Sequence, residues 1–134
     1  MERTYIMLKP DAFRRNLVGK IISRIEDKAF KITDAKMFTL TEEKLREHYV
    51  HIADKPFFKD LVKYMTSGPV LGMIIEGNDC IQGMRNIMGK TNWLEASAGT
   101  IRGDYANSTT ENLIHGSDSK ESAEVEIKRF FGGK

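Results

Sequence analysis

Apolar and polar positions alternate along this chain between short extended runs and stripes with helical spacing. Residues 4–8 are largely apolar and stop at Lys9-Pro10-Asp11, which predicts a strand. Residues 70–75 form the longest apolar run and predict a buried strand. Residues 32–40 predict a third strand, and residues 112–115 predict a short fourth one.

Helical stripes fill the intervals between these runs. Val18, Ile21, Ile22 and Ile25 stand at i, i+3, i+4 and i+7 and predict one face of a helix. Three further helices are predicted after the capping residue Thr41, over residues 57–65, and over residues 80–88 with Gly89 as the stop. A last helix is predicted near the C-terminus. It begins with the capping pair Asp118 and Glu121, and its apolar face lies in residues 123–131.

Residues 90–111 show no clear period and are mostly polar, which predicts a long loop. Loops longer than about 12–15 residues in a compact domain are usually functional. The order of the predicted elements, four strands interleaved with helices, indicates an α/β or α+β layered domain. The pattern alone favours a parallel sheet, and it leaves a mixed or antiparallel sheet open.

Composition narrows the class of protein. The 134 residues suit one globular domain, and no stretch approaches the roughly 20 apolar residues that a membrane helix needs. The single cysteine, Cys80, excludes an intrachain disulfide framework, and no apolar secretory segment follows Met1. We therefore expect a cytoplasmic protein with no membrane partner. The net charge of +2 gives no sign of nucleic-acid binding, which we do not expect.

Gly89-Lys90-Thr91 has the letters that end a phosphate-binding P-loop, but the rest of the motif fails. A P-loop requires a glycine five positions before its Gly-Lys pair, where this chain has Met84. A P-loop also lies between a strand and a helix, whereas this tripeptide follows a predicted helix. We therefore do not expect a P-loop here.

His115 is the strongest candidate for chemistry. It follows the long polar loop, ends an apolar strand and precedes the N-terminus of the last helix, where free N–H groups attract anions. A neutral imidazole is well populated at pH 7, and it is competent as a base and as a nucleophile toward phosphorus. The alternative is a histidine whose ring nitrogens are satisfied in the core.

Glu126 borders the apolar stripe of the last predicted helix. A carboxylate in that position favours a buried partner, and His115 on the adjacent strand is one candidate. On the pattern alone, an ordinary glutamate that flanks the core is the simpler interpretation. His48 and His51 lie in a charged segment, and we expect both to be solvated surface residues.

Three cationic residues are candidates for binding phosphate. Lys9 ends the first predicted strand, Arg85 lies on the predicted helix over residues 80–88, and Arg102 lies in the long loop. Arginine binds phosphate oxygens with a planar fork, and lysine binds them as a point charge. These residues form a phosphate site only if the fold brings them together.

Five segments, in this order, resemble the nucleoside diphosphate kinase family, and the resemblance spans essentially the whole chain. They are Ile6-Met7-Leu8-Lys9-Pro10-Asp11, His48-Tyr49 followed by Lys55-Pro56-Phe57-Phe58, Ser67-Gly68-Pro69-Val70, Gly99-Thr100-Ile101-Arg102-Gly103-Asp104, and Asn112-Leu113-Ile114-His115-Gly116-Ser117-Asp118-Ser119.

The resemblance implies a single kinase domain over residues 1–134 with a ferredoxin-like α+β fold. Its sheet would be four-stranded and antiparallel, covered by helices, in place of the parallel sheet that the pattern favours. The implied reaction transfers the γ-phosphoryl group of a nucleoside triphosphate to a nucleoside diphosphate. The implied route is ping-pong, through a phosphorylated His115.

The resemblance also assigns roles at the reacting centre. His115 would be the nucleophile, and Glu126 and Ser117 would hold its ring. Lys9 would neutralise charge that develops on the transferring phosphoryl group, and Tyr49 would support that group.

The remaining roles that the resemblance implies concern the nucleotide. The phosphates would contact Lys9, Arg85, Thr91 and Arg102, and the sugar hydroxyls would contact Lys9 and Asn112. Phe57 would stack on one face of the base, with Leu61 beside it and Thr109 opposite. Stacking would tolerate any base, because every base has a π-face.

Mg²⁺ is the implied cofactor, held mainly by phosphate oxygens and water with Asp118 nearby. The implied assembly is a homo-oligomer, a tetramer or a hexamer. Two other classes of function compete with the kinase. A non-catalytic nucleotide-binding module would need a lost nucleophile or a broken phosphate site, and neither is seen. Nucleic-acid binding as the main role is disfavoured by the balanced charge and by the lack of a basic, aromatic-rich stripe.

Overall fold

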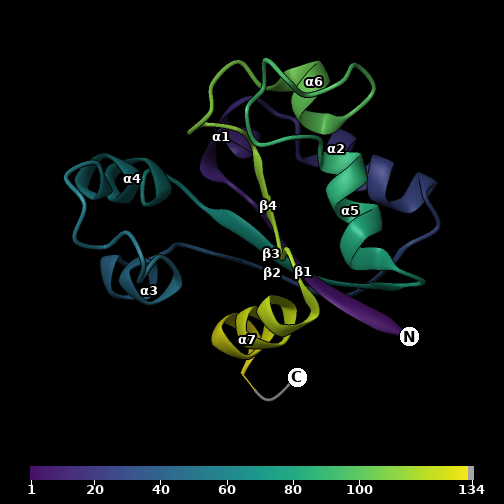
Figure 1. The fold of residues 1–134 in the computed structure, drawn as a ribbon, viewed down its shortest axis with the longest axis horizontal. Helices are drawn as coiled ribbons and strands as arrows, with labels where there is room; N and C mark the ends of the chain where they lie inside the picture. The colour runs from purple at the N-terminus through teal and green to yellow at the C-terminus, as the bar shows by residue number, and fades with distance from the viewer. Residues whose placement is uncertain (133–134) are drawn as a thin grey trace.

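The computed structural model describes residues 1–132 as a four-stranded sheet with helices packed on both faces (Figure 1). The strands are β1 (Glu2–Leu8), β2 (Lys31–Phe38), β3 (Val70–Gly77) and β4 (Ile114–Gly116). Their order is β2-β3-β1-β4, and each neighbouring pair is antiparallel. This is the ferredoxin-like α+β arrangement that the resemblance implies.

The parallel sheet favoured by the hydrophobic pattern is therefore wrong. The near-continuous apolar run of β3 is typical of a strand buried on both faces, as in parallel sheets. Here helices cover both faces of an antiparallel sheet, so five of the eight residues of β3 are buried on a strand whose direction the pattern does not reveal.

The helices follow the predicted stripes, with two additions. They are α1 (Pro10–Arg14), α2 (Val18–Asp27), α3 (Glu42–His48), α4 (Phe58–Met65), α5 (Cys80–Met88), α6 (Ile101–Tyr105) and α7 (Lys120–Phe131). The two that the pattern misses, α1 and α6, have five residues each, too few to show a period. No helix in residues 1–132 is long and apolar enough to cross a membrane.

The helix termini confirm two predicted caps and correct a third. Thr41 caps α3 by accepting the Lys44 N–H, and Gly89 ends α5 with a φ of +84°. The cap of α7 is Ser119, whose hydroxyl accepts the Ser122 N–H, and not the predicted pair Asp118 and Glu121. The extended backbone of Ser119 gives its short side chain the reach to the first turn.

Two cores lie on opposite faces of the sheet, and β1 contributes to both. Ile6 and Leu8 pack in the core that contains buried residues of α2 and α5, among them Ile25 and Met84. Tyr5 and Met7 pack in the core that contains buried residues of α3, α4 and α7, among them Phe130. Side chains alternate between the two faces along a strand, so those of β4 that point to the face of the second core lie next to α7.

The register between β1 and β4 fixes that face. His115 lies opposite Met7 across the pair, so both side chains lie on the face of the sheet that α7 covers. The backbone ladder continues on either side of the short strand, because Lys9 N–H donates to Leu113 O and Ser117 N–H donates to Tyr5 O. The end of β4 is therefore held rigidly against the central strand.

Candidate active site

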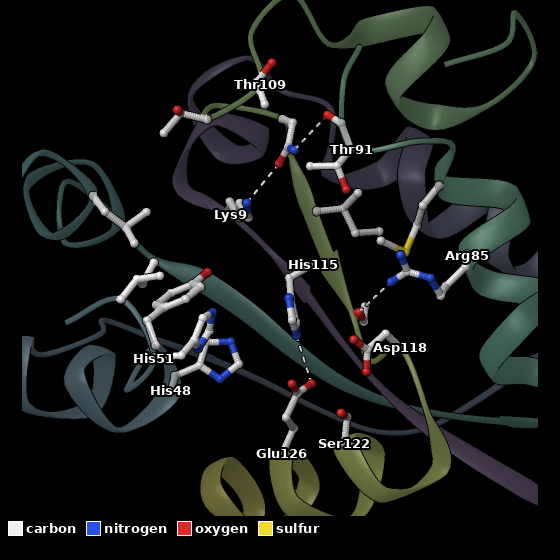
Figure 2. Close-up of a pocket in the computed structure, with 18 of the residues that line it drawn as sticks. Lys9, His48, His51, Arg85, Thr91, Thr109, His115, Asp118, Ser122 and Glu126 are labelled. Carbon is white, nitrogen blue, oxygen red and sulfur yellow. Dashed lines mark hydrogen bonds and ion pairs between the residues drawn. The ribbon is translucent and has the colours of Figure 1, made fainter. Parts of the chain in front are cut away.

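A cavity of about 930 Å³ opens beside His115, between the pair α3–α4, the start of α7 and the loop that follows α5 (Figure 2). Twelve of the thirteen residues that the resemblance assigns to the site line it: Lys9, Tyr49, Phe57, Leu61, Arg85, Thr91, Arg102, Thr109, Asn112, His115, Asp118 and Glu126. The thirteenth, Ser117, is only 1% exposed and lies behind Glu126. A volume of this size suits a small-molecule ligand.

His115 is held by Glu126 from α7. Its Nε2 lies 2.8 Å from Glu126 Oε1, and the same oxygen accepts the Ser117 hydroxyl at 2.8 Å. The glutamate is therefore not the ordinary flanking residue that the pattern favoured. Figure 2 shows the imidazole standing between β4 and α7, with Glu126 below it.

The charge state of Glu126 fixes the tautomer of the histidine. Burial raises the pKa of Glu126, but the hydrogen bonds and charge of His115 and the hydrogen bond from Ser117 outweigh it and leave the pKa below its usual value. The carboxylate is thus ionised and accepts a proton from Nε2. Neutral His115 therefore carries its proton on Nε2 and keeps a lone pair on Nδ1.

A tight turn directly before β4 orients the backbone here. Leu113 has a φ of +79°, an unusual value for a branched side chain, and Ile114 N–H donates to Asn112 O at 2.9 Å. These features close a strained three-residue γ-turn. Strain of this kind persists where the surrounding structure enforces it, often next to a site of function. The turn lets Asn112 and His115, three residues apart, both line the cavity.

Lys9 reaches the cavity from the end of β1. Its Nζ donates to Asn112 Oδ1 at 2.8 Å, and Asn112 Nδ2 in turn donates to Thr91 O at 3.4 Å. Burial and the nearby Arg102 lower the pKa of Lys9 to about 8. The fold thus holds a lysine at a place where its charge is unfavourable without an anion.

Two arginines come from the other side of the cavity. Arg85, on α5, donates to Gly116 O at 3.4 Å. Arg102, on α6, is only 5% exposed and donates to Gly89 O at 2.9 Å and to Ile114 O at 2.6 Å. Burial and Arg85 lower the pKa of Arg102 to about 10, which leaves it charged at neutral pH. Three cations from distant parts of the sequence therefore surround the approach to His115.

The part of the cavity near α4 is apolar. Phe57 precedes the first turn of α4 and is 53% exposed, and Leu61 follows one turn later on the same wall. Tyr49, just after α3, has its pKa raised to about 12 by burial and by Glu126, so its hydroxyl keeps its proton. Thr109, in the loop before β4, also lines the cavity. A flat ring with a polar edge would fit against such a wall.

His48 corrects the prediction of a solvated surface residue, whereas His51 is exposed as predicted. The His48 ring packs edge to face on His115, with 4.8 Å between ring centroids. A signal was present in the sequence, because Leu45, His48, Tyr49 and Ile52 follow the i, i+3, i+4, i+7 spacing of a buried helix face. The charged residues next to His48 in the sequence made this spacing hard to recognise.

Asp118 lines the same cavity and feels the charge of Arg85. A hydrogen bond from Ser122 lowers its pKa, and the charge of Arg85 acts in the same direction, so the group is ionised. Figure 2 places it between Arg85 and the start of α7. A single carboxylate facing a cationic cavity can hold a hard cation only together with oxygens from a ligand.

Comparison with known proteins shows which family has the same sequence pattern. A model of the family described as nucleoside diphosphate kinase matches residues 2–134. The nucleoside diphosphate kinase of Methanothermobacter thermautotrophicus is 55% identical over 131 residues, which cover 98% of this chain and 87% of that protein. That of Acetivibrio thermocellus is 53% identical over 131 residues, which cover 98% of this chain and 96% of that protein.

Solved structures agree in fold. The nucleoside diphosphate kinase from Encephalitozoon cuniculi, without ligand, has a TM-score of 0.95 and 48% identity, and the match covers 98% of this chain and 90% of that one. The halophilic enzyme from Halobacterium salinarum, in complex with CDP, has a TM-score of 0.93 and 47% identity, covering 97% and 87%. The ferredoxin-like fold and the cationic cavity around a histidine are those of a phosphotransferase. With matches of this extent, the chain belongs to the nucleoside diphosphate kinase family.

Proposed function

We infer that this protein transfers the γ-phosphoryl group of a nucleoside triphosphate to a nucleoside diphosphate, in two half-reactions joined by phosphorylated His115. The observation that carries this proposal is the His115 ring, held by Glu126 at Nε2 and facing a cavity that Lys9, Arg85 and Arg102 line. Family membership supports the reaction class, and one domain over residues 1–134 suffices for it.

The two half-reactions use one ring nitrogen. In the first, the Nδ1 lone pair bonds to the γ-phosphorus, the bond from that phosphorus to the β–γ bridging oxygen breaks, and a nucleoside diphosphate leaves. In the second, a β-phosphate oxygen of the acceptor attacks the phosphorus and the P–N bond breaks, which restores the lone pair. Glu126 stays ionised throughout and balances the positive charge on the ring.

The cations act on the phosphates. Lys9, Arg85 and Arg102 neutralise the charge that spreads over the transferring group and the leaving oxygen, and they are already in place before the nucleotide binds. The protonated hydroxyl of Tyr49 donates to the transferring group, and Thr91 adds a contact to the phosphates. Ser117 keeps Glu126 in position.

The nucleoside lies along the apolar wall. Phe57 stacks on the base, with Leu61 beside it and Thr109 opposite, while Lys9 and Asn112 contact the sugar hydroxyls. The relative from Halobacterium salinarum was solved with CDP, which supports a nucleoside diphosphate as ligand. Because stacking reads no base edge, we expect broad acceptance of bases.

Mg²⁺ is the proposed cofactor, with Asp118 as its proposed carboxylate contact. The donor set fits, because Mg²⁺ in phosphate sites keeps several waters and uses one or two carboxylates together with phosphate oxygens. When bound, Mg²⁺ supplies charge neutralisation on the phosphates. The cluster of His48, His115 and Glu126 offers mainly nitrogen ligands, which Mg²⁺ does not favour.

We also propose a homo-oligomer, a tetramer or a hexamer, located in the cytoplasm. β2 is an edge strand of the sheet, and its Met37 is 64% exposed, while Leu94 in the loop after α5 is 73% exposed. Exposed apolar side chains on an open sheet edge favour self-association. The single, buried Cys80 is compatible with a reducing compartment.

The test is phosphorylation of the isolated protein. Incubation with γ-labelled ATP and Mg²⁺ should give an acid-labile, base-stable phosphoprotein that transfers its label to GDP. His115→Ala should abolish both steps, whereas His51→Ala, at an exposed histidine of the same cavity wall, should still form the phosphoprotein. Transfer to GDP by the His115→Ala protein would overturn the assignment. Nucleotide binding without phosphorylation would point to the non-catalytic module, and salt-dependent DNA binding far tighter than nucleotide binding would point to a nucleic-acid role.

A further inference from the structure

We propose that His48 is a positioning residue for His115: Arg129 locks it in one tautomer, and its neutral ring holds the plane of the His115 imidazole. The proposal rests on the proposed function, because it takes His115 as the phosphoryl acceptor. It concerns a residue that the sequence placed on the solvated surface.

The tautomer follows from one hydrogen bond. Arg129 Nη1, on α7, lies 2.7 Å from His48 Nδ1. A guanidinium has donors only and stays charged, so Nδ1 must be the acceptor. The proton of the neutral ring is therefore on Nε2. The Arg129 side chain is itself held by an ion pair between its Nε and Glu47 Oε1 at 3.4 Å.

The ring is confined on several sides. It packs edge to face against His115 at 4.8 Å, against Tyr49 at 4.6 Å and against Phe130 at 5.3 Å between centroids. Burial and the neighbouring His115 lower the pKa of His48 to about 3, so the ring is uncharged wherever the enzyme is folded and working. A neutral, immobile ring can set the orientation of its neighbour without repelling the cation that forms there.

One helix holds both histidines. Glu126 binds His115 and Arg129 binds His48, and these two residues lie three positions apart, on one face of α7. The ring of His48 from α3 and the ring of His115 from β4 are therefore both hydrogen-bonded to α7. A shift of either ring would break a hydrogen bond to α7.

The same geometry excludes a different interpretation. His48, His115 and Glu126 each offer a ligand atom, and these atoms lie within 4.8 Å of one another, as in a site for a transition metal. A metal would need the lone pair of His48 Nε2, but Arg129 leaves the proton on that nitrogen. The guanidinium charge would also repel a cation. His48 Nε2 is a buried donor without a hydrogen-bond partner in residues 1–132.

That unpaired donor supports a functional role. A buried N–H without a partner costs about 1–3 kcal/mol, so folded proteins rarely retain one without a reason. Here a ring nitrogen of His48 lies within 4.8 Å of a carboxylate oxygen of Glu126, and His48 is among the groups that lower the pKa of Glu126. His48 therefore both fixes the ring of His115 and favours the carboxylate that orients it.

The first experiment reads the tautomer, independently of catalysis. Nitrogen-15 NMR of the imidazole groups should show His48 neutral at pH 7, with the proton on Nε2. Arg129→Met should change the tautomer ratio, while the control Lys128→Met, at the exposed neighbour on α7, should not. A His48 that is protonated at pH 7, or that carries its proton on Nδ1, would overturn the proposal.

The second experiment separates positioning from folding. His48→Asn keeps an acceptor near the Nδ1 position, and His48→Gln keeps a donor near the Nε2 position, but neither keeps the ring. In single-turnover phosphorylation both should slow the formation of phosphohistidine by about tenfold or more, with nucleotide Kd nearly unchanged. His48→Phe keeps the packing, so it should slow the step less than His48→Asn does.

Other results would contradict the proposal. Wild-type phosphorylation rates in a folded His48→Asn protein would show that His48 does not position His115. A rate loss that is matched by equal loss of Kd and of thermal stability in all three variants would assign a merely structural role. Absence of phosphohistidine in the wild-type protein would refute the proposed function, and the tautomer measurement would still decide the state of His48.

Discussion

Glu126 stands at the centre of the site because one of its oxygens serves two partners. It accepts the proton of His115 Nε2 and the hydroxyl of Ser117, each at 2.8 Å. The same contacts tie catalysis to stability, since they favour the ionised carboxylate in the folded state and are absent in the unfolded chain.

We expect Glu126→Gln to slow phosphorylation of His115 by about ten- to a hundredfold, because the ring loses its anionic anchor. It should also change how protein stability falls at acidic pH. The folded pKa of Glu126 is depressed, so its stabilisation is present above the unfolded pKa and is lost as pH falls through the folded pKa, below about 4.5. Melting temperatures from pH 7 to pH 3 should therefore fall less steeply in the variant than in the wild type. Equal slopes would contradict this assignment.

Lys9 is expected to titrate when nucleotide binds. Its pKa of about 8 reflects burial and Arg102, and a phosphate beside it should raise that value. Nucleotide binding near pH 8.5 should therefore take up protons, which calorimetry in buffers of different ionisation enthalpy measures. Lys9→Arg should abolish the uptake, and an unchanged uptake would place the titrating group elsewhere.

The depressed pKa of Lys9 also makes the free energy of unfolding depend on pH. Because the folded pKa lies below the unfolded value of 10.5, the unfolded chain binds more protons between about pH 8 and 10.5. The contribution of Lys9 to stability therefore rises with pH over that window. The difference in unfolding free energy between wild type and Lys9→Gln, followed from pH 7 to pH 10, should shift in favour of the wild type.

At the scale of elements, a buried hydrogen bond joins α4 to α1. The Tyr64 hydroxyl donates to Asp11 Oδ1, and Asp11 Oδ2 is buried without a partner in residues 1–132. Asp11 follows Lys9 by two residues, and α4 carries the apolar wall of the cavity. The contact therefore links the wall that faces the base to the strand that faces the phosphates.

Tyr64→Phe should cost about 1–3 kcal/mol in urea unfolding, because it leaves a buried carboxylate without its donor. It should also raise nucleotide KM more than it lowers kcat, since α4 loosens while the centre around His115 is untouched. Tyr105→Phe, on α6, is the matched control and should have a smaller effect. A double-mutant cycle with Asp11→Asn that gives no coupling would refute the link.

The loop after α5 is ordered by a close backbone approach at Gly103. A Cβ there would lie 1.9 Å from Ser97 O, so Gly103→Ala must distort α6, which carries Arg102. We expect a loss of roughly 1–3 kcal/mol and a fall in phosphate affinity. Gly19→Ala is the control, because no atom within 4 Å opposes its Cβ and it lies inside α2, so it should stabilise by about 0.5–1 kcal/mol.

At the scale of the whole molecule, the open edge of the sheet predicts association. β2 has β3 as its neighbour on one side, and Met37 on it is 64% exposed. Light scattering after gel filtration should give four or six times the 15.3 kDa of one chain. Met37→Lys should reduce that mass, whereas Lys36→Met should not. A wild-type monomer at micromolar concentration would refute the assembly.

Most elements could be predicted from the sequence, because their signals are local. The stripe of Ile21 and Ile25 identifies α2, and the run that begins at Val70 identifies β3. The five-residue helices escaped because they are shorter than two periods. Site residues followed from resemblance to a family motif, and the pattern alone left Glu126 undecided and misplaced His48.

The sequence by itself determined where the longer helices and the strands lie, and through the family resemblance it supplied the candidate site residues. The hydrophobic pattern left open the direction of the strands and the pairing of His115 with Glu126, which only the family resemblance implied, and the contact of Arg129 with His48 came from the tertiary structure alone. The reason is physical: periodicity records contacts between residues a few positions apart, whereas Lys9, Arg85 and Arg102 meet only when packing on two faces of one sheet closes the long loops between them. The net charge of +2 therefore says little about a cavity in which folding gathers Lys9, Arg85 and Arg102.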